Sequence, residues 1–515
     1  MTETTRSRWE LSKTEVVARD GMVVAGRLQA AEAGARILQE GGNAVDAAVG
    51  AGWAVSVVEP WMNGIGGAGA MVVHHEGHQV AFDFGIRAPR AARPGMFELE
   101  PVGGGAFGWR AVKDRANEVG HQAVGIPGLV AGLCLAHERF GRLPRKVVME
   151  PAIELAEAGF DADWHTTLMV AINVETLARF PVTGRAYLGQ ANSPPKPESR
   201  FANADRIVCT DLAGTLRRIA QEGPDAFYRG EVANAIARDM AANGGLLSRE
   251  DLENYRPRVT EGGLRGSYRG LVVTGVPGTG SPVVQDILDL LDPHDIAAMR
   301  AGSVEVLHVL AEACRQSFAR YFERAAPAAA HTTHLCAVDR DRNAASITQT
   351  LGLMFGSFVT VPGTGILLNN LMSVFDPEPG HTHSIFAGAS PAAAYAPTLL
   401  SNLGGLRAAL GAPGGRRIPT AVAQVISNLV DLEMGIQEAI SAPRIHAESP
   451  LVEVDSRFTK AVLDGLSSLG HEVVAGEKTP VSFNFAHPVG IVVRPNGWLA
   501  GGTDPMAPSA AVGLG

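Results

Sequence analysis

The chain has 515 residues, of which 46% are hydrophobic, 60 are glycine and 31 are proline; that is enough to bury a large core and, by length alone, to form about three domains. Lys and Arg number 44 against 53 Asp and Glu, which gives a formal net charge of −9 with no basic block of the kind that binds nucleic acid. The sequence contains no run of about 18 apolar residues, the length that a membrane-spanning helix needs. The first residues lack the apolar core of a secretory signal, so we expect a cytoplasmic protein without a membrane partner.

The four cysteines, Cys134, Cys209, Cys314 and Cys336, lie far apart and form no Cys-x-x-Cys pair. Such spacing argues against a zinc site or a disulfide framework and favours isolated reduced thiols. We therefore expect neither a metal nor another cofactor.

The first part of the chain is predicted to combine helices and strands. Residues 26–40 have the apolar spacing of a helix, which the glycines at 41 and 42 end. Asn43 can cap a second helix directly after it. A glycine-rich turn after Pro60 leads into a strand, and another strand is expected over 79–84.

The middle of the chain is mainly helical. Residues 127–160 predict two helices separated by a turn at 140–144. Ser248 with an acidic residue three positions later resembles a capping box, which marks a helix start. A buried strand over 271–276 and an amphipathic helix over 303–323 follow.

The composition changes beyond this helix. Residues 324–331 (RAAPAAAH) are small and featureless, as in an exposed, flexible linker. The chain after the linker becomes rich in strands and then returns to helices. The strands are predicted at 332–338, 344–350, 355–361 and 364–370, and the helices at 419–439 and 456–469.

The first two of these strands flank a five-residue turn, 339–343, which predicts a β-hairpin. A register symmetric about Asp341 places Thr332 directly opposite Thr350, with Cβ atoms about 4.5–5.5 Å apart. Two hydroxyls would then meet at the open end of the hairpin, next to the linker. Threonine pairs across strands are also ordinary, so the pattern by itself leaves a structural role open.

Three glycine-rich segments have the composition of anion-binding loops. Those at 63–67 and 278–280 lack the Gly-Lys-Ser/Thr ending of a phosphate-binding loop, so close packing or turns are favoured. The third, 411–417 (GAPGGRR), can present backbone N–H groups to an anion or simply form a turn.

Several long stretches resemble the gamma-glutamyltranspeptidase family of N-terminal nucleophile (Ntn) hydrolases. They run nearly end to end and include AAEAGARILQEGGNAVDAAV, VVEPWMNGIGGAGAM, GIPGLVAGL, TTHLCAVD, GILLNN and GAPGGRRI. The resemblance implies an α+β fold, a four-layer αββα sandwich, made as a precursor that cuts itself before Thr332. Residues 1–331 would form the large subunit and 332–515 the small subunit, together one structural domain.

The resemblance also implies roles for catalytic residues. Thr332 would be the nucleophile, activated by the α-amine that cleavage frees. Thr350 would hydrogen-bond the hydroxyl of the nucleophile, and the N–H groups of Gly414 and Gly415 would form the oxyanion hole.

The positions that bind the glutamyl group in the family are altered. Gly85 stands where an Arg should grip the α-carboxylate. Other polar positions of that site align with Gly352, Leu371, Val374, Ala393 and Ala394. A pocket built from these residues is more apolar and should bind a zwitterionic head poorly. Relatives changed in this way include cephalosporin acylases and oxamate amidohydrolase.

Arg87, Tyr395 and Arg416 are candidates for a replacement substrate site. An Arg can hold a carboxylate in a two-pronged hydrogen bond, although surface statistics favour a solvated or salt-bridged surface residue for each of these arginines.

The sequence thus predicts an amidohydrolase or acyltransferase that forms an acyl-Thr intermediate on a small non-glutamyl amide, with water or an amine as acceptor. One alternative is genuine gamma-glutamyl transfer with a rearranged pocket. The other is an unprocessed homologue that only binds a ligand. The two fragments of the precursor would stay together, and a higher oligomer is open.

Overall fold

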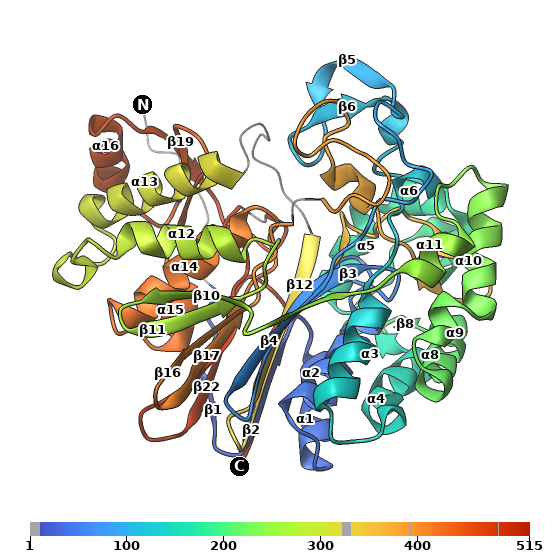
Figure 1. The fold of residues 1–515 in the computed structure, drawn as a ribbon, viewed down its shortest axis with the longest axis horizontal. Helices are drawn as coiled ribbons and strands as arrows, with labels where there is room; N and C mark the ends of the chain where they lie inside the picture. The colour runs from blue at the N-terminus through green and yellow to red at the C-terminus, as the bar shows by residue number, and fades with distance from the viewer. Residues whose placement is uncertain (1–10, 322–330, 392, 483) are drawn as a thin grey trace.

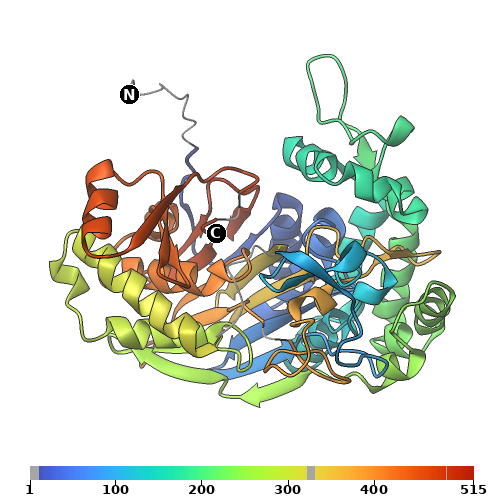
Figure 2. The same ribbon diagram turned by 90° about the horizontal axis from the view of Figure 1, so that it is seen from above.

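The computed structural model describes residues 11–321, 331–391, 393–482 and 484–515. Its centre consists of two seven-stranded sheets, each antiparallel throughout. Helices cover the outer face of each sheet, so that the layers follow in the order helix, sheet, sheet, helix (Figure 1; Figure 2 shows the same layers from above). The predicted αββα sandwich is confirmed.

The sheet that carries the candidate nucleophile is called the β12 sheet. Its strands, in spatial order, are β23 (Ala510–Leu514), β2 (Gly21–Ala25), β12 (His331–Asp339), β13 (Ala344–Gly352), β3 (Ala68–His75), β4 (His78–Phe84) and β9 (Arg258–Glu261).

The facing sheet is called the β17 sheet. Its order is β1 (Val16–Ala18), β22 (Leu499–Thr503), β21 (Val489–Val493), β17 (Gly405–Gly411), β16 (Thr398–Asn402), β11 (Leu271–Gly275) and β10 (Leu264–Tyr268). Each sheet contains strands from before and from after residue 331, so both parts of the chain build the same core.

Two sets of helices flank the sheets (Figure 1). On the side of the β12 sheet they are α1 (Leu28–Gln39), α2 (Ala44–Val58), α3 (Leu129–Phe140), α4 (Arg145–Ala158), α5 (Trp164–Ala171), α6 (Val174–Ala178), α7 (Pro181–Tyr187), α8 (Thr210–Glu222), α9 (Asp225–Tyr228), α10 (Glu231–Ala242) and α11 (Arg249–Asn254). On the side of the β17 sheet they are α12 (Ser281–Leu291), α13 (Val304–Tyr321), α14 (Arg417–Val430), α15 (Ile436–Ser441) and α16 (Lys460–Ser468).

Short strands complete the fold outside the sandwich. They are β5 (Leu99–Gly104), β6 (Arg110–Val112), β7 (Phe160–Asp161), β8 (Arg206–Ile207), β14 (Thr360–Val361), β15 (Ile366–Leu367), β18 (Ile445–Ala447), β19 (Leu451–Asp455) and β20 (Glu472–Gly476).

The core has one apolar layer between the sheets and one under each set of helices. Strand β12 contributes to two of these layers because successive side chains of a strand point to opposite faces. Leu335 and Ala337 pack under the helices, whereas Cys336 and Val338 pack between the sheets. Burial on both faces explains why residues 335–338 of this strand are all apolar.

Most predicted elements before the linker are confirmed. Asn43 caps α2 in a full capping box, and Ser248 does the same for α11. Helices α3 and α4 are separated at the predicted turn. The linker predicted at 324–331 lies outside the described residues except for His331, which begins β12.

Two predictions after the linker are wrong in extent. The strands expected at 355–361 and 364–370 shrink to the two-residue pair β14 and β15, because Phe355, Gly356 and Phe358 turn the chain with positive φ angles of 57°, 51° and 62°. The helix expected at 419–439 breaks between α14 and α15, where Glu433 has φ 52°.

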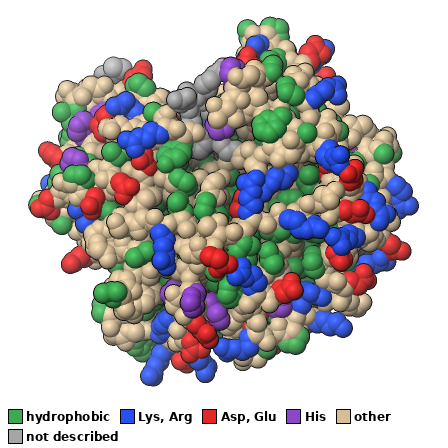
Figure 3. All heavy atoms as spheres, in the orientation of Figure 1, with side chains coloured by type: hydrophobic (Ala, Val, Ile, Leu, Met, Phe, Trp, Pro, Cys, Tyr) green, Lys and Arg blue, Asp and Glu red, His purple; other side chains and the backbone are tan. Residues whose placement is uncertain are grey.

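On the face shown in Figure 3, basic and acidic side chains are interspersed. Within the described ranges, no helix is both long and apolar enough to cross a membrane. All four cysteines are free thiols.

Candidate active site

Thr332 is the second residue of β12, at the end of the hairpin that the sequence predicts. The predicted register is confirmed from Thr333, which pairs with Gln349, to Val338. The register breaks at Thr332, because His331 pairs with Gly352 and Thr333 with Gln349. Thr332, the one residue between His331 and Thr333, therefore faces two residues of β13, Thr350 and Leu351. The predicted direct pairing of the two threonines is therefore replaced by a bulge, a feature common beside active sites.

The Thr350 hydroxyl is engaged with the backbone just before Thr332. It donates a hydrogen bond to the carbonyl oxygen of His331 at 2.6 Å and accepts one from the Gly352 N–H at 2.8 Å. The hydroxyl therefore polarises the carbonyl of the peptide bond that joins His331 to Thr332. Thr332 and Thr350 are both buried, with 4% and 3% of their surface exposed.

The glycine pair precedes helix α14. Gly414 and Gly415 have φ angles of 141° and 60°, which favour glycine. A Cβ atom at Gly414 would lie 2.6 Å from the side chain of Ala486, so the close approach also requires glycine there. Gly415 lies on the wall of the cavity beside Thr332, where the N-terminus of a helix stabilises negative charge.

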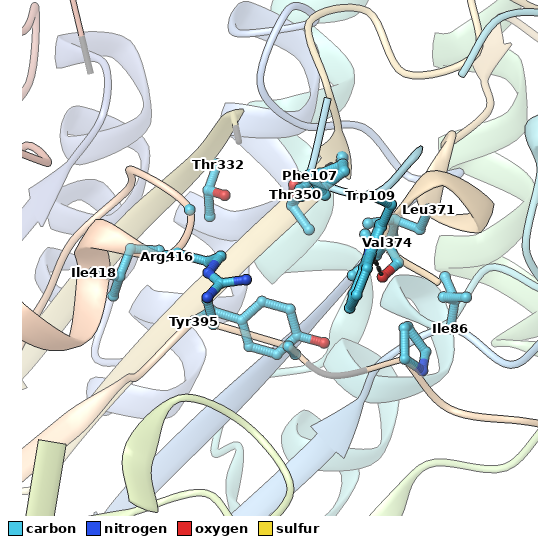
Figure 4. A pocket seen from close by; sticks show the side chains of 15 residues that line it. Ile86, Phe107, Trp109, Thr332, Thr350, Leu371, Val374, Tyr395, Arg416 and Ile418 are labelled. Atoms are coloured by element: carbon cyan, nitrogen blue, oxygen red, sulfur yellow. Dashed lines mark hydrogen bonds between the residues drawn. The ribbon is translucent and has the colours of Figure 1, made fainter. Parts of the chain in front are cut away.

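A cavity of about 60 Å³ adjoins Thr332, Thr350 and Gly415. Apolar side chains make up most of its wall: Ile86, Phe107, Trp109, Leu371, Val374, Pro391, Ala393, Ala394 and Ile418, joined by Gly352, Tyr395 and Arg416. Figure 4 shows Thr332 and Arg416 on one side and Trp109, Val374, Leu371 and Ile86 on the other.

The positions at which the sequence departs from glutamyl binding converge on this cavity. Gly352, Leu371, Val374, Ala393 and Ala394, which come from separate segments, all lie on its wall. The altered positions therefore form one apolar surface opposite the candidate nucleophile.

Gly85 lies just behind the wall. A Cβ atom at this position would lie 2.9 Å from the Tyr395 hydroxyl and 3.0 Å from a carboxylate oxygen of Asp83. Tyr395 thus occupies the space that a side chain at position 85 would need. Burial raises the pKa of the Tyr395 phenol well above its ordinary value, so the ring is a neutral part of the wall.

Arg416 lies on the wall, but its charge is matched from behind. Its guanidinium forms a buried ion pair with Glu448, whose other oxygen lies 2.9 Å from Nε2 of His446. Burial opposes the ionisation of Glu448, but His446 and Arg416 outweigh it and hold its pKa below the ordinary range. Burial likewise lowers the pKa of Arg416.

The third substrate candidate, Arg87, does not line the cavity. One of its terminal nitrogens donates to the carbonyl of Ile86 at 3.2 Å, and Ile86 supplies the wall in its place. Sequence reasoning missed Phe107 and Trp109, which follow β5 in a glycine-rich turn. The Trp109 indole donates to the Val374 carbonyl at 2.9 Å, which fixes this aromatic wall. The sequence signal that could have found them is the presence of two aromatic residues in a turn that has no periodic pattern.

No group of three or more metal-ligating side chains occurs within the part of the chain that the structure describes. The hydroxyl residues Thr332 and Thr350 line the cavity together with Gly415, which lies next to the N-terminus of α14.

A four-layer sandwich with a threonine near the start of a central strand, beside a helix N-terminus, defines an Ntn-type hydrolase. The sequence profile of the family described as Gamma-glutamyltranspeptidase matches residues 30–325 and 319–514, and the chain belongs to this family. It is therefore an enzyme, an amidohydrolase with a threonine nucleophile.

Individual relatives cover nearly the whole chain. The Acylase ACY 1 proenzyme of Pseudomonas sp. (strain SE83) is 37% identical over 96% of this chain and 94% of its own length. The Glutathione hydrolase proenzyme of Escherichia coli (strain K12) is 31% identical over 96% and 91%. The crystal structure of a cephalosporin acylase from Bacillus halodurans superimposes with a TM-score of 0.86 at 25% identity, covering 100% of this chain and 99% of that one.

Proposed function

We propose that this protein cleaves itself at the His331–Thr332 bond and then hydrolyses amides with a small apolar acyl group through an ester on Thr332. The observation that carries the proposal is the apolar cavity that joins Thr332 to Gly415 and the N-terminus of α14. The proenzyme names of the acylase and glutathione hydrolase relatives support a precursor that is processed.

The mature reaction follows from the site. The α-amine of Thr332 removes the proton from its own hydroxyl, and the oxygen attacks the amide carbon of the substrate. The oxygen that becomes negative lies toward Gly415, where backbone N–H groups and the helix terminus stabilise it. The amine leaves with a proton, and water then hydrolyses the ester to release the acid.

The cavity wall favours an apolar acyl group over a glutamyl group. A glutamyl head carries a carboxylate and an ammonium, and each would lose its hydration against aliphatic and aromatic side chains. Arg416 is already balanced by Glu448, so the wall offers little net charge to either group. Transfer of the glutamyl head into this cavity would cost several kcal/mol, which corresponds to a preference of about 100-fold or more for an apolar acyl group.

Two relatives are named as acylases, which supports cleavage of an acyl amide but does not specify the acyl group. Of the substrates that the sequence suggests, an acylated cephalosporin fits better than oxamate, because an acyl chain fills the apolar wall whereas the carboxylate of oxamate does not. The same geometry would serve gamma-glutamyl transfer only if charged groups entered the cavity from outside the described wall.

The test has two parts. Thr332→Ala should leave one 54 kDa band on a denaturing gel, whereas the native chain should give two fragments, the smaller beginning with Thr332. The processed enzyme is then compared on acyl anilides, acylated cephalosporins, oxamate and a gamma-glutamyl anilide. A processed, active Thr332→Ala protein would refute the nucleophile, and a preference for the gamma-glutamyl anilide would refute the apolar acyl group.

A further inference from the structure

A second cavity, of about 30 Å³, adjoins Thr332 and shares no other described wall residue with the apolar cavity of about 60 Å³, which is called the acyl pocket. Its wall includes Glu59, His165, Thr332 and Thr333. A cavity of this size holds one or two water molecules, provided that polar groups face it. Glu59 lies directly after α2, and His165 lies in the first turn of α5.

Polar atoms without partners gather around this cavity. Glu59, Arg27 and His165 expose only 4%, 2% and 3% of their surfaces. Among the described residues, Oε2 of Glu59, Nη1 of Arg27 and Nδ1 of His165 make no hydrogen bond. Buried polar atoms are nearly always satisfied by protein or ordered water. Glu59 and His165 line the cavity, whereas Arg27 lies outside its wall, so we infer that water in the cavity contacts the carboxyl and the imidazole.

Glu59 is held against the strand of the nucleophile. The Thr333 hydroxyl hydrogen-bonds the Glu59 carboxyl. A Cβ atom at Gly26 would lie 2.5 Å from that hydroxyl and 2.8 Å from Oε2 of Glu59. The glycine therefore permits the strand, the hydroxyl and the carboxyl to meet one residue away from Thr332.

The charges around Glu59 leave it able to exchange a proton near neutral pH. Arg27 forms an ion pair with Asp163 at 2.9 Å, which offsets most of its charge. Burial lowers the pKa of His165 to about 3, so this imidazole is neutral. His487 lies 3.3 Å from Asp504, and burial also lowers its pKa.

Burial raises the pKa of Glu59 to about 7, against the lowering effects of the Thr333 hydroxyl and Arg27. A buried carboxyl with such a pKa accepts and returns protons efficiently near neutral pH.

We propose that Glu59 is the proton acceptor for self-cleavage, acting on the Thr332 hydroxyl through a water molecule in this cavity. This role rests on the proposed cleavage at His331–Thr332. It addresses the stage at which the α-amine, the base of the mature enzyme, is still tied up in the peptide bond.

The proton and bond changes balance. The Thr332 hydroxyl passes its proton through water to the Glu59 carboxylate as its oxygen bonds to the carbonyl carbon of His331. The bond from that carbon to the Thr332 nitrogen breaks, and Glu59 returns the proton through water to the nitrogen, which becomes the free α-amine. A water molecule then hydrolyses the resulting ester, releasing the carboxyl group of His331 and restoring the Thr332 hydroxyl.

The test follows self-cleavage of freshly synthesised full-length precursor on denaturing gels from about pH 5 to about pH 9. The native rate should rise with pH through about 7 and then level off. Glu59→Gln, which keeps the size of the side chain, should slow cleavage by about 100-fold or more and remove this rise. Asp431→Asn, which changes a buried carboxyl bound to Tyr268 far from the cavity, is the control and should keep the native pH profile.

A second variant covers the case in which Glu59→Gln does not fold, as judged by a cooperative thermal melt. Thr333→Val removes the hydrogen bond that favours ionised Glu59, so the midpoint of the pH profile should move up by roughly 0.5–1 unit. A folded Glu59→Gln precursor with the native rate and profile, or an unmoved midpoint in Thr333→Val, would overturn the role of Glu59. If cleavage occurs elsewhere than before Thr332, N-terminal sequencing shows that the proposed function itself is wrong.

Discussion

The hydrogen bond from Thr350 to the His331 carbonyl makes a quantitative prediction about self-cleavage. As Thr332 attacks, this carbonyl oxygen becomes negative, and the hydroxyl 2.6 Å away is already aimed at it. Thr350→Val keeps the shape of the side chain and removes the donor. Loss of one donor to a developing oxyanion costs about 2.7–4 kcal/mol, so cleavage should slow by about 100- to 1,000-fold.

The same substitution has a separate effect on stability. The Gly352 N–H loses its acceptor, which at present lies 2.8 Å away, and an unsatisfied buried donor costs about 1–3 kcal/mol. Thr350→Ser retains both hydrogen bonds and should process within a few-fold of the native rate. The comparison of valine with serine therefore isolates the hydroxyl from the packing of the methyl group.

The assay is a time course of precursor loss on a denaturing gel, made well below the melting temperature of each variant. A Thr350→Val precursor that is folded and cleaves at the native rate would refute the role of the hydroxyl. Slow cleavage in Thr350→Ser as well would show that the methyl group, which serine lacks, also contributes to the rate.

Three further predictions concern buried groups around the site. Arg416→Met should lower stability by about 3–5 kcal/mol, because Glu448 is left as an uncompensated buried charge, and adding Glu448→Gln should recover most of the loss in a denaturant titration. Gly85→Ala should lower stability by about 1–3 kcal/mol, because the new methyl group displaces the Tyr395 hydroxyl. In thermal melts, Tyr395→Phe should reduce this loss in the double variant; if the effects of the two substitutions simply add, the contact is contradicted. Between about pH 4.5 and about pH 7 the folded chain keeps a proton on Glu59 that the unfolded chain releases. An uncleavable precursor should therefore lose up to about 3 kcal/mol of stability as pH rises through this range. The loss should be absent in Glu59→Gln, and equal pH slopes in the two proteins would show that the pKa of Glu59 is not raised.

The hairpin shows what the sequence could predict and where it fell short. Alternation of side chains and a symmetric turn were enough to give the register from Thr333 to Val338. The bulge at Thr332 depends on the pairing of His331 with Gly352, and both residues lie outside the two predicted strands. Register was therefore predictable within the periodic runs and not beyond them.

The site was predictable only where a local pattern or a family motif marks it. Phe107 and Trp109 lie in a turn without periodicity, and Glu448 is an isolated acidic residue whose partner is 32 positions earlier in the chain. Glu59 likewise follows an apolar helix in which nothing distinguishes a buried carboxyl from a solvated one. These residues matter because segments distant in sequence meet around Thr332, and such meetings are set by the tertiary fold.

The acyl pocket offers no unbalanced charge on the wall residues that the structure describes, so its expected selectivity differs from recognition of a substrate by an oppositely charged side chain. Tyr395 is a neutral phenol, and the charge of Arg416 is balanced by Glu448 from behind the wall. A substrate carboxylate approaching Arg416 would have to compete with a carboxylate that is already buried and fixed, while losing its own hydration. Under the proposed function, we therefore expect the pocket to select by rejecting charged acyl groups. Its contacts with an accepted acyl chain would be those of shape and apolar area, which discriminate between neighbouring chain lengths by only about 1–3 kcal/mol. A single processed enzyme of this kind should accept several apolar acyl groups of similar size at comparable rates.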